Sequence, residues 1–485
     1  MRTLLGIDLG TSSVKVVLTD EALRVLTSAT HHYPVERPRP GWSETDPVLW
    51  WRATVAAVRQ VCAEAHPAPS AIGFSGQMHG VVLADRHGRP LRPAMLWSDT
   101  RAVDLLDVYR DLPGEVLRGL GNPLSPGMAG PLLGWLARHE PATLAAAHHA
   151  LQPKDWLRVQ LTGEFAAEPG DASATLLQHL GTGSWSPEVV AALDVPESLL
   201  PELLPSSTTV AGTLTSAAAA ELGIPAGIPV AAGTADTAAA ALGSGLTTPG
   251  IVQLTIGSGT QTITPVRPPR STELPEHPVT HLYRGALQDS WYAMAATLNG
   301  GLALDWVRRT HQVSWEQLYA AAGDEPHQDD PLFLPYLGGE RTPLLDPLLT
   351  GSWIGLTARH DTATLLRCAL EGVAGAIADA LDALPGTTPD VVRLAGGGTV
   401  VPGWRQLLAD VLGVGLDALD VAGASGVGAA ATAAPAGGVC AESELLELLH
   451  PALQRVAEPV DAAHRRYRER RARRTDILRR LGAAG

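Results

Sequence analysis

One stretch near the start of the chain reads Gly6-Ile7-Asp8-Leu9-Gly10-Thr11-Ser12-Ser13-Val14-Lys15-Val16-Val17-Leu18. Two apolar, β-branched runs lie on either side of a Gly-Thr-Ser-Ser turn, a pattern that predicts a β-hairpin. Gly10 lets a ligand approach the backbone, and the hydroxyl and N–H groups of residues 11–13 form a row of donors that suits phosphate oxygens. Asp8, at the end of the first strand, is placed to hold a hydrated Mg²⁺ beside them. An ordinary polar hairpin tip explains this stretch alone equally well.

The composition indicates a globular protein with more than one domain. The chain has 485 residues, of which 45% are hydrophobic. Because one hydrophobic core rarely serves so long a chain, we expect two or three domains. The net charge of −14 argues against nucleic acid or an anionic membrane as a partner. Cys62, Cys368 and Cys440 are far apart and fit no metal-ligand spacing, which favours reduced thiols in a cytoplasmic protein.

No segment is predicted to be a signal peptide or a membrane span. Asp8 and the polar turn interrupt the first apolar run too early for a signal peptide. Residues 224–246 carry no full charge except Asp236, but their prolines and glycines favour a buried strand, a turn and a helix. We therefore expect a soluble protein.

Three helices stand out in the pattern of apolar and charged residues. Asp46 suits an N-cap and Pro47 a first helical position, and the apolar residues that follow at helical spacing are Trp51, Val55, Val58 and Cys62. A long core helix is predicted from the single apolar face formed by Leu366, Leu370, Val373, Ile377 and Leu381. Residues 464–481 are rich in arginine and favour a solvated surface helix over a nucleic-acid tether.

Two polar segments in the first half of the chain could bind a small polar ligand. Gly76-Gln77-Met78-His79-Gly80 follows a predicted strand, and its two glycines indicate a tight turn that a ligand can approach. A lone histidine there is more often a surface or core histidine. Trp97-Ser98-Asp99-Thr100-Arg101 can form a sugar platform. A strand-end ion pair beside a core tryptophan explains this second segment equally well.

An aspartate lies at the start of a small helix near residue 236. Residues 228–232 predict a short buried strand, and an alanine-rich helix follows. Thr234 is expected to cap that helix and to place Asp236 in its first turn. The helix dipole would keep this carboxylate ionised and available as a proton acceptor. Without context, a second capping aspartate is the favoured interpretation.

The hairpin pattern recurs near the middle of the chain. Residues 251–264 predict a strand, the turn Gly257-Ser258-Gly259-Thr260 and a second strand. Two such hairpins at the starts of two similar halves suggest a duplicated domain whose hydroxyl-rich turns grip a nucleotide's phosphates from both sides. Later, Gly396-Gly397-Gly398-Thr399 follows another strand and can admit a base or a phosphate. That glycine run alone is weak evidence.

Taken together, these motifs resemble the FGGY carbohydrate kinases. The chain has no Gly-x-x-x-x-Gly-Lys-Ser/Thr phosphate loop. Within the family, it is most similar to the members that phosphorylate a ketose. The resemblance covers nearly the whole chain, in order, through residues 8–12, 76–80, 97–99, 153–155, 236, 257–259, 337–343 and 396–398.

The resemblance implies an α/β fold with two actin-like, ribonuclease H-type domains on either side of a catalytic cleft. Residues 1–245 would hold the sugar site, the base and the first phosphate hairpin, and residues 246–485 would bind ATP. The implied reaction is the phosphorylation of D-xylulose to D-xylulose 5-phosphate by ATP and Mg²⁺. The oligomeric state is left open, with a homodimer as one assembly.

The resemblance also assigns roles to individual residues. Asp236 would be the catalytic base, and Asp8 would hold Mg²⁺ through water. The sugar would contact Gln77, Met78, His79, Trp97, Asp99, Asp236 and Thr237. ATP would contact Gly10, Thr11, Ser12, Ser13, Lys15, Gly257, Ser258, Gly259, Gly397, Gly398 and Thr399.

Three alternatives remain open at this point. A kinase of the same fold could act on another ketose, a polyol or a sugar acid, because Thr237 stands where the family usually has an amide. A homologue could bind sugar or nucleotide without turnover, because residues 399–402 offer few polar contacts to a base. An actin-like or chaperone-like ATPase is disfavoured, since Met78, His79 and Trp97 would then have no role.

Overall fold

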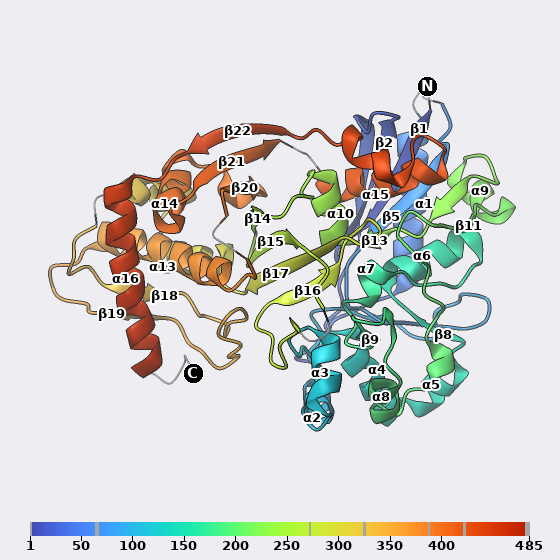
Figure 1. The fold of residues 1–485 in the computed structure, drawn as a ribbon, viewed down its shortest axis with the longest axis horizontal. Coiled ribbons are helices and arrows are strands. Elements are labelled where there is room, and N and C mark those ends of the chain that lie inside the picture. Colours follow the sequence, from blue (N-terminus) through green and yellow to red (C-terminus); the bar gives the residue numbers. More distant parts are fainter. Residues whose placement is uncertain are drawn as a thin grey trace.

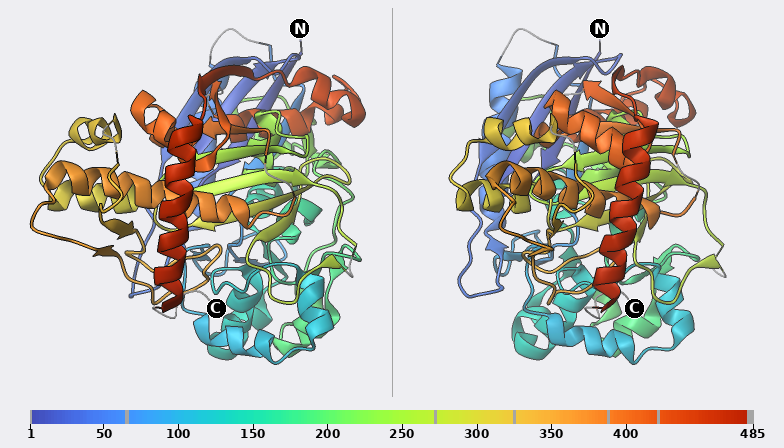
Figure 2. Two further views of the ribbon diagram at one scale, coloured as in Figure 1. Left: turned by 60° about the vertical axis from the view of Figure 1, so that its left-hand side comes forward. Right: turned by 90° about the vertical axis from the view of Figure 1, so that its left-hand side faces the viewer.

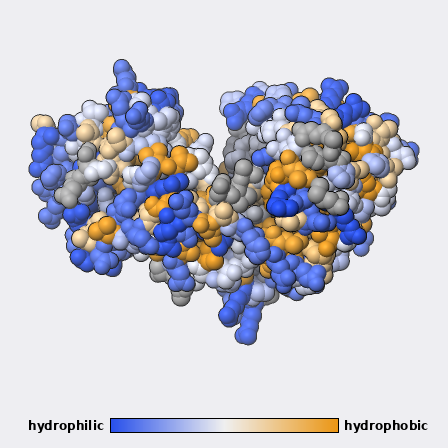
Figure 3. Space-filling model, turned by 90° about the horizontal axis from the view of Figure 1, so that it is seen from above, coloured by the Kyte–Doolittle hydropathy of each residue, from blue (hydrophilic) through white to orange (hydrophobic). Residues whose placement is uncertain are grey.

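The computed structural model describes residues 2–63, 67–270, 273–323, 326–386, 389–420 and 423–480. Within these ranges the chain forms two large mixed sheets that lie side by side along the longest axis (Figure 1). Seen from above, the surface shows two lobes with a notch between them (Figure 3). No helix in the described ranges is long and apolar enough to cross a membrane.

The first sheet is built around the predicted N-terminal hairpin. Its strand order is β11-β12-β5-β1-β2-β3, with β13 paired to β5. The bounds are β1 Thr3–Leu9, β2 Ser13–Asp20, β3 Val25–His32, β5 Ala71–Gly76, β11 Val210–Thr213, β12 Pro229–Ala231 and β13 Thr234–Ala235. The hairpin is confirmed, with Asp8 opposite Lys15 in the antiparallel pair β1–β2.

The second sheet repeats the topology of the first. Its order is β16-β17-β15-β14-β20-β21-β22. The bounds are β14 Ile251–Ile256, β15 Thr260–Val266, β16 His281–Arg284, β17 Trp291–Thr297, β20 Val391–Ala395, β21 Gly415–Asp420 and β22 Ala452–Ala457. In both sheets, the first strand of a hairpin pairs in parallel with a later strand: β1 with β5, and β14 with β20. The predicted recurrence of the hairpin is therefore confirmed.

Helices cover both sheets, and a mainly helical segment extends from the first. Those packed on or near the first sheet are α1 Pro47–Cys62, α6 Pro153–Thr162, α7 Pro169–Ala172, α9 Ser216–Leu222, α10 Asp236–Gly243 and α15 Ala424–Ala436. The extending segment contains η1 Val103–Leu105, α2 Leu106–Arg110, α3 Gly114–Leu120, α4 Ala129–His139, α5 Pro141–Ala146, α8 Pro187–Ala192 and η2 Glu197–Leu199. The second sheet carries α11 Gly301–Thr310, α12 Trp315–Ala320, η4 Ala321–Gly323, α13 Thr362–Asp382, η5 Gly397–Thr399, α14 Pro402–Leu412 and α16 Asp461–Arg480, whereas η6 Glu442–Leu448 packs against α15.

Short two-stranded pairs complete the fold. They are β4 Glu44–Thr45 with β7 Ala94–Met95, β6 Val82–Ala84 with β8 His149–Leu151, β9 Gln178–His179 with β10 Ser184–Trp185, and β18 Leu332–Leu334 with β19 Ser352–Ile354.

The predicted start of the first helix is confirmed, but its predicted buried face is shifted. Asp46 caps α1 by accepting a hydrogen bond from the Val48 N–H at 3.0 Å. The residues buried along α1 are Pro47, Trp50, Ala53, Thr54, Ala57, Val58 and Val61. Trp51, Val55 and Cys62 are only partly buried. The stripe is turned by about one residue because Trp50, rather than Trp51, packs edge-on against buried Trp156.

The long core helix is confirmed, whereas the arginine-rich helix is more buried than predicted. All five apolar residues predicted for α13 are buried. Helix α16 runs along the outside of the second lobe (Figure 2), but Tyr467, Arg474 and Leu478 on one face of it are buried. Arg471 pairs with Asp379 of α13 at 2.7 Å, and Arg474 pairs with the same carboxylate. The prediction of a surface helix is therefore confirmed, but one face of the helix is buried, because Asp379 of α13 pairs with these arginines.

One helix from the second half of the chain packs on the first sheet. Helix α15 contacts β1, β5 and α10, and its Val427 and Ala430 belong to the same apolar cluster as Leu4 and Val17. Helices α10 and α15 pack closely because each has a glycine, Gly243 or Gly428, where the two helices meet. A Cβ on Gly428 would lie 1.9 Å from the carbonyl oxygen of Ala239. The two halves of the chain are therefore joined through helix backbones in direct contact.

We expect Gly428→Ala to lower the free energy of unfolding by about 3 kcal/mol, because backbone on both sides leaves the added methyl nowhere to go. The matched control is Gly403→Ala in α14, where the nearest atom to the new Cβ lies 3.7 Å away. That change should be neutral or stabilise by about 0.5–1 kcal/mol. Urea unfolding of both variants measures the difference. Equal effects of the two substitutions would contradict close packing of α10 on α15.

Candidate active site

Two cavities meet between the lobes. One, here called the central cavity, has a volume of about 470 Å³. The other, here called the aromatic cavity, has a volume of about 930 Å³ and lies in the second lobe. Gly257, Ser258 and Leu302 line both. A ligand that fills the aromatic cavity can therefore reach a second ligand in the central cavity at this shared wall.

The central cavity brings together many of the residues predicted from the sequence. From the first lobe, its wall includes Thr11, Met78, His79, Trp97, Asp236 and Thr237. From the predicted second turn, it includes Gly257, Ser258 and Gly259. Gly397 and Gly398 line the aromatic cavity. The rest of the predicted set lies outside these walls.

The tip of the first hairpin is held rigidly beside the central cavity. The Gly10 N–H donates to the Ser13 carbonyl at 2.9 Å and closes the turn. The carbonyl of Gly10 accepts from the Tyr33 hydroxyl at 2.6 Å and from the amide of Gln77 at 3.3 Å. The indole N–H of Trp97 donates to the Thr11 hydroxyl at 3.0 Å. Trp97 therefore positions the turn as well as lining the cavity.

Gln77 and Asp99 do not line the cavity, contrary to the sugar-contact roles expected for them. Gln77 is buried behind the hairpin turn that it supports. Asp99 is fully buried, and both of its carboxylate oxygens accept hydrogen bonds from Arg101, at 2.9 and 2.6 Å. The Ser43 N–H donates to the same carboxylate at 2.7 Å. The ion pair of the alternative interpretation is present at Asp99, but Trp97 is exposed and lines the cavity instead of lying in the core.

Two further predicted ATP contacts have structural partners. The Thr399 hydroxyl donates to the Gly396 carbonyl at 2.8 Å and so fastens its own turn. Lys15 lies opposite Asp8 on β2, and its positive charge partly offsets the rise that burial causes in the pKa of Asp8. Ser12 is exposed at the hairpin tip.

Asp8 and Asp236 form a pair of neighbouring, half-buried carboxylates. Strand β5 lies between them, because Ser75 pairs with Asp8 on one side and with Thr234 on the other. The Ser75 hydroxyl donates to Asp8 Oδ1 at 2.5 Å. Burial raises the pKa of Asp8. Burial together with the negative charge of Asp8 raises the pKa of Asp236 to about 7.

This pair corrects two predictions made around residue 236. Thr234 does not cap the helix; it belongs to β13, and α10 begins at Asp236 after Ala235. The helix dipole does not keep Asp236 strongly ionised, because desolvation and Asp8 outweigh it. Asp236 Oδ1 instead accepts from the N–H and the hydroxyl of Thr237, at 2.6 and 3.1 Å. A carboxylate with a pKa near 7 is a stronger base than the sequence predicts.

His79 presents a hydrogen-bond acceptor to the central cavity. Its Nδ1 lies 2.6 Å from the Ala174 carbonyl. Because a carbonyl only accepts, Nδ1 carries the proton, and Nε2 is left as an acceptor. Burial lowers the pKa of His79 to about 4, so the ring is neutral at pH 7. Its backbone φ of +73° is uncommon for a residue other than glycine and is typical of functional sites.

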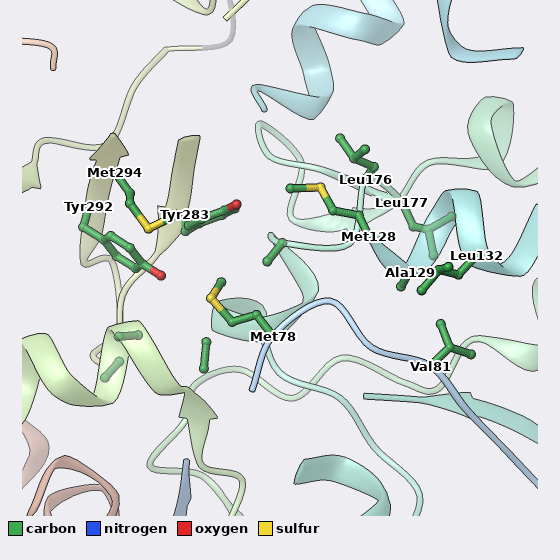
Figure 4. Packing of buried hydrophobic residues seen from close by; sticks show 14 of the residues in the cluster. Met78, Val81, Met128, Ala129, Leu132, Leu176, Leu177, Tyr283, Tyr292 and Met294 are labelled. Atoms are coloured by element: carbon green, nitrogen blue, oxygen red, sulfur yellow. The ribbon is translucent and has the colours of Figure 1, made fainter. Parts of the chain in front are cut away.

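The wall opposite His79 comes from the second lobe and has no assigned role in the sequence analysis. Figure 4 shows Met78 pointing toward Tyr283, Tyr292 and Met294 on strands β16 and β17. The ring of Tyr283 lies 6.1 Å from that of His79. Arg341 also lines this cavity. Arg341 belongs to the motif at residues 337–343, so the sequence could have indicated its role. Strands β16 and β17, by contrast, have no sequence feature that distinguishes them from ordinary core strands.

The aromatic cavity has the character of a nucleotide site. Trp306, Trp315 and Tyr319 line it, and the rings of Trp315 and Tyr319 stack at 5.7 Å. Aromatic faces of this kind suit a planar base. The four-residue spacing of Trp315 and Tyr319 on α12 is the one feature of the sequence that could have identified this pair.

Comparison with known proteins agrees with this arrangement. Residues 3–243 match the family model for the N-terminal domain of the FGGY family of carbohydrate kinases, and residues 254–437 match the model for its C-terminal domain. The chain is 37% identical to a xylulose kinase from Escherichia coli (strain K12) over 453 residues, which is 92% of each chain. It is 31% identical to a xylulose kinase from Bacillus subtilis (strain 168), covering 90% of this chain and 88% of that protein.

A solved structure shows the same fold. The crystal structure of a "xyloylose kinase" from Brucella ovis superimposes with a TM-score of 0.91 at 33% identity, covering 99% of this chain and 100% of that one. The predicted α/β fold with two actin-like domains is thereby confirmed.

We expect the carboxyl group of Asp236 to titrate near pH 7 in the ligand-free protein. Carbon-13 NMR of labelled aspartate, with the signal assigned by its loss in Asp236→Asn, measures the midpoint. Asp8→Asn should move the midpoint toward lower pH, because it removes the neighbouring negative charge. Asp305→Asn, a change in the wall of the aromatic cavity, should leave it in place. A midpoint near pH 4 in the unmodified protein would contradict the coupled pair.

Proposed function

The chain belongs to the FGGY family of carbohydrate kinases, which use ATP, and on that premise we propose that it phosphorylates D-xylulose to D-xylulose 5-phosphate. The identity to xylulose kinases over most of the chain supports this choice of ketose. The coarser activity, phosphorylation of a sugar by ATP, follows from family membership itself.

One observation carries the proposal: the central and aromatic cavities share the wall formed by Gly257, Ser258 and Leu302. ATP in the aromatic cavity would place its base near Trp315 and its phosphates at the Gly257-Ser258 turn. The sugar in the central cavity would then face the terminal phosphate across this turn. Thr11 of the first hairpin lies on the same cavity wall, so donors from both lobes reach the phosphates.

Asp236 supplies the base in this scheme. Its Oδ1 is held by Thr237, which leaves Oδ2 to accept the proton of the sugar hydroxyl that attacks. The oxygen of that hydroxyl bonds to the γ-phosphorus, and ADP leaves with the electrons of the broken P–O bond. A pKa of about 7 lets the carboxylate be ionised before the reaction and still basic enough to hold the proton. Thr237, where the family usually has an amide, thus serves the base.

The residues present fit a magnesium ion. No group of three or more candidate metal ligands exists among the described residues, so no all-protein metal cage is formed there. Mg²⁺ in phosphoryl-transfer sites is usually held by one or two carboxylates together with water and phosphate oxygens, and Asp8 with Asp236 meets that need. Asp8 would hold the ion through water. When bound, Mg²⁺ neutralises charge on the phosphates, and it would relieve the repulsion between the two carboxylates.

A coupled ADP-release assay with D-xylulose, D-ribulose, xylitol and glycerol tests the proposal. We expect D-xylulose to give the highest kcat/KM, by about tenfold or more, because differential contacts worth roughly 1.4 kcal/mol change a rate tenfold. Chelation of Mg²⁺ by EDTA should remove the activity. Preference for glycerol or xylitol would overturn the ketose assignment. If none of these sugars stimulates ADP release, the proposed kinase activity itself is overturned.

A further inference from the structure

We propose that Asn122 and Ser173 are positioning residues of the sugar site: they bind the outer edge of strand β16 from the first lobe and so fix the two walls of the central cavity relative to each other. Neither side chain belongs to the wall that the described residues form around this cavity, so both act through the residues that do line it. This inference rests on the proposed function, because it takes the central cavity as the place where the sugar binds.

Strand β16 is the outermost strand of the second sheet and pairs only with β17 in the described parts of the chain. The backbone groups on its other side therefore need partners. Asn122 Oδ1 accepts a hydrogen bond from the Leu282 N–H at 2.9 Å, and Asn122 Nδ2 donates to the Leu282 carbonyl at 3.1 Å. Ser173 Oγ accepts from the Arg284 N–H at 3.0 Å. The two side chains thus bind β16 where a further strand would otherwise pair.

The same pattern continues beyond the end of β16. The Ser207 hydroxyl donates to the Ala286 carbonyl, and the Gln288 N–H donates to Glu442 Oε1 at 2.5 Å. Every second residue from 282 to 288 therefore binds a group outside the second sheet, as expected of the outward-facing backbone groups of an edge strand. Ser207 belongs to the first lobe, and Glu442 lies on η6, which packs against α15. This edge is thus attached to the side of the first lobe at four successive positions.

The segment of the first lobe that binds β16 also orients His79. Ala174, which directly follows Ser173, accepts the hydrogen bond from His79 Nδ1 at 2.6 Å. Asn122 Nδ2 donates to the Ser173 carbonyl at 3.2 Å. Asn122 therefore contacts the backbone of the segment that holds His79 as well as the backbone of β16. Loss of its side chain would allow these two backbones to move relative to each other.

On the side of the second lobe, β16 supports the wall that faces His79. The ring of Tyr283, on the anchored part of β16, lies 6.1 Å from the ring of His79. Two residues earlier, His281 pairs with Met294 of β17, and Met294 lines the central cavity. Figure 4 shows Tyr283 and Met294 on the side of these strands that faces Met78. The two anchoring side chains therefore set the distance between this wall and His79.

Position 122 requires a side chain that both donates and accepts. Asn122 is 3% exposed, and its Nδ2 lies within 3.0–3.2 Å of three carbonyl oxygens, those of Leu120, Ser173 and Leu282. Aspartate has the same shape, but its carboxylate would face these carbonyls with no proton to donate. Alanine would leave the N–H and the carbonyl of Leu282 without the partner that they have.

The test compares Asn122→Ala and Ser173→Ala with the unmodified enzyme in steady-state kinetics. Each substitution should raise the KM for D-xylulose about tenfold, because the sugar must then order a wall that these hydrogen bonds hold in the unmodified enzyme. The KM for ATP should not change, because β16 lies outside the wall of the aromatic cavity. The matched control is Gln178→Ala, which removes another buried amide of the first lobe. Its Nε2 donates to the Gly183 carbonyl within its own hairpin, at 3.0 Å, so both KM values should stay the same even where Tm falls.

A double-mutant cycle shows whether Asn122 acts through His79. In a His79→Ala background, Asn122→Ala should raise the KM for D-xylulose by less than about threefold, because the side chain that it positions is already absent. A full tenfold rise in that background would contradict a positioning role toward His79.

A lower Tm of Asn122→Ala and Ser173→Ala with an unchanged KM for D-xylulose would overturn the inference and leave both residues structural. An equal rise in the KM of both substrates would overturn it as well. Should Asn122→Ala fail to fold, Ser173→Ala, which removes a single hydroxyl group, decides by the same criteria. The unmodified enzyme alone decides the proposed function: if it prefers another sugar, that sugar replaces D-xylulose in the comparison. If it phosphorylates none, the proposed function fails and this inference fails with it.

Discussion

The site depends on one unfavourable interaction, the repulsion between the half-buried carboxylates of Asp8 and Asp236. Strands β1, β5 and β13 bring the two groups together, because Ser75 of β5 pairs with a residue of each neighbour. In water the two charges would scarcely influence each other. In this cavity, desolvation and, after it, the negative charge of Asp8 raise the pKa of Asp236 to about 7. A base for phosphoryl transfer and a place for a cation arise from the same pair.

The helix pair α10–α15 links this carboxylate pair to the second lobe. Asp236 begins α10, and α15 comes from the second half of the chain to pack on α10 and on β1. Glycines at residues 243 and 428 allow the two backbones to touch. The remaining wall of the central cavity comes from the β14–β15 hairpin, from β17 and Leu302, and from the loop that carries Arg341. A shift of the second lobe would therefore alter the donors around the sugar more than it alters the base.

Much of the fold could be predicted from local pattern, because hairpins, caps and core helices are determined by nearby residues. The hairpin at residue 10, the Asp46 cap and the apolar face of α13 are examples. Features that depend on distant partners could not be predicted. The raised pKa of Asp236 depends partly on Asp8, on another strand, and the burial of Arg474 in α16 depends on Asp379 of α13. Tyr283, beside His79, and Trp315, in the aromatic cavity, were missed because in the sequence such aromatic residues resemble ordinary core residues. Gln77 was misplaced because its partner Gly10 lies far away in the chain, whereas the partner of Asp99 is Arg101, only two residues away, as the ion-pair alternative had allowed.

The most direct measurement of the central claim is the turnover of Asp236→Asn. Asparagine keeps the shape of the side chain and its bond to Thr237 but cannot accept a proton. A positioned base contributes roughly 10²–10⁴-fold in rate, or about 3–5 kcal/mol of barrier. The account predicts a fall in kcat of about that factor, with an unchanged Tm and sugar affinity within a few-fold of the unmodified enzyme. Turnover of the folded variant within a few-fold of the unmodified enzyme would contradict it and leave Asp236 as a structural residue.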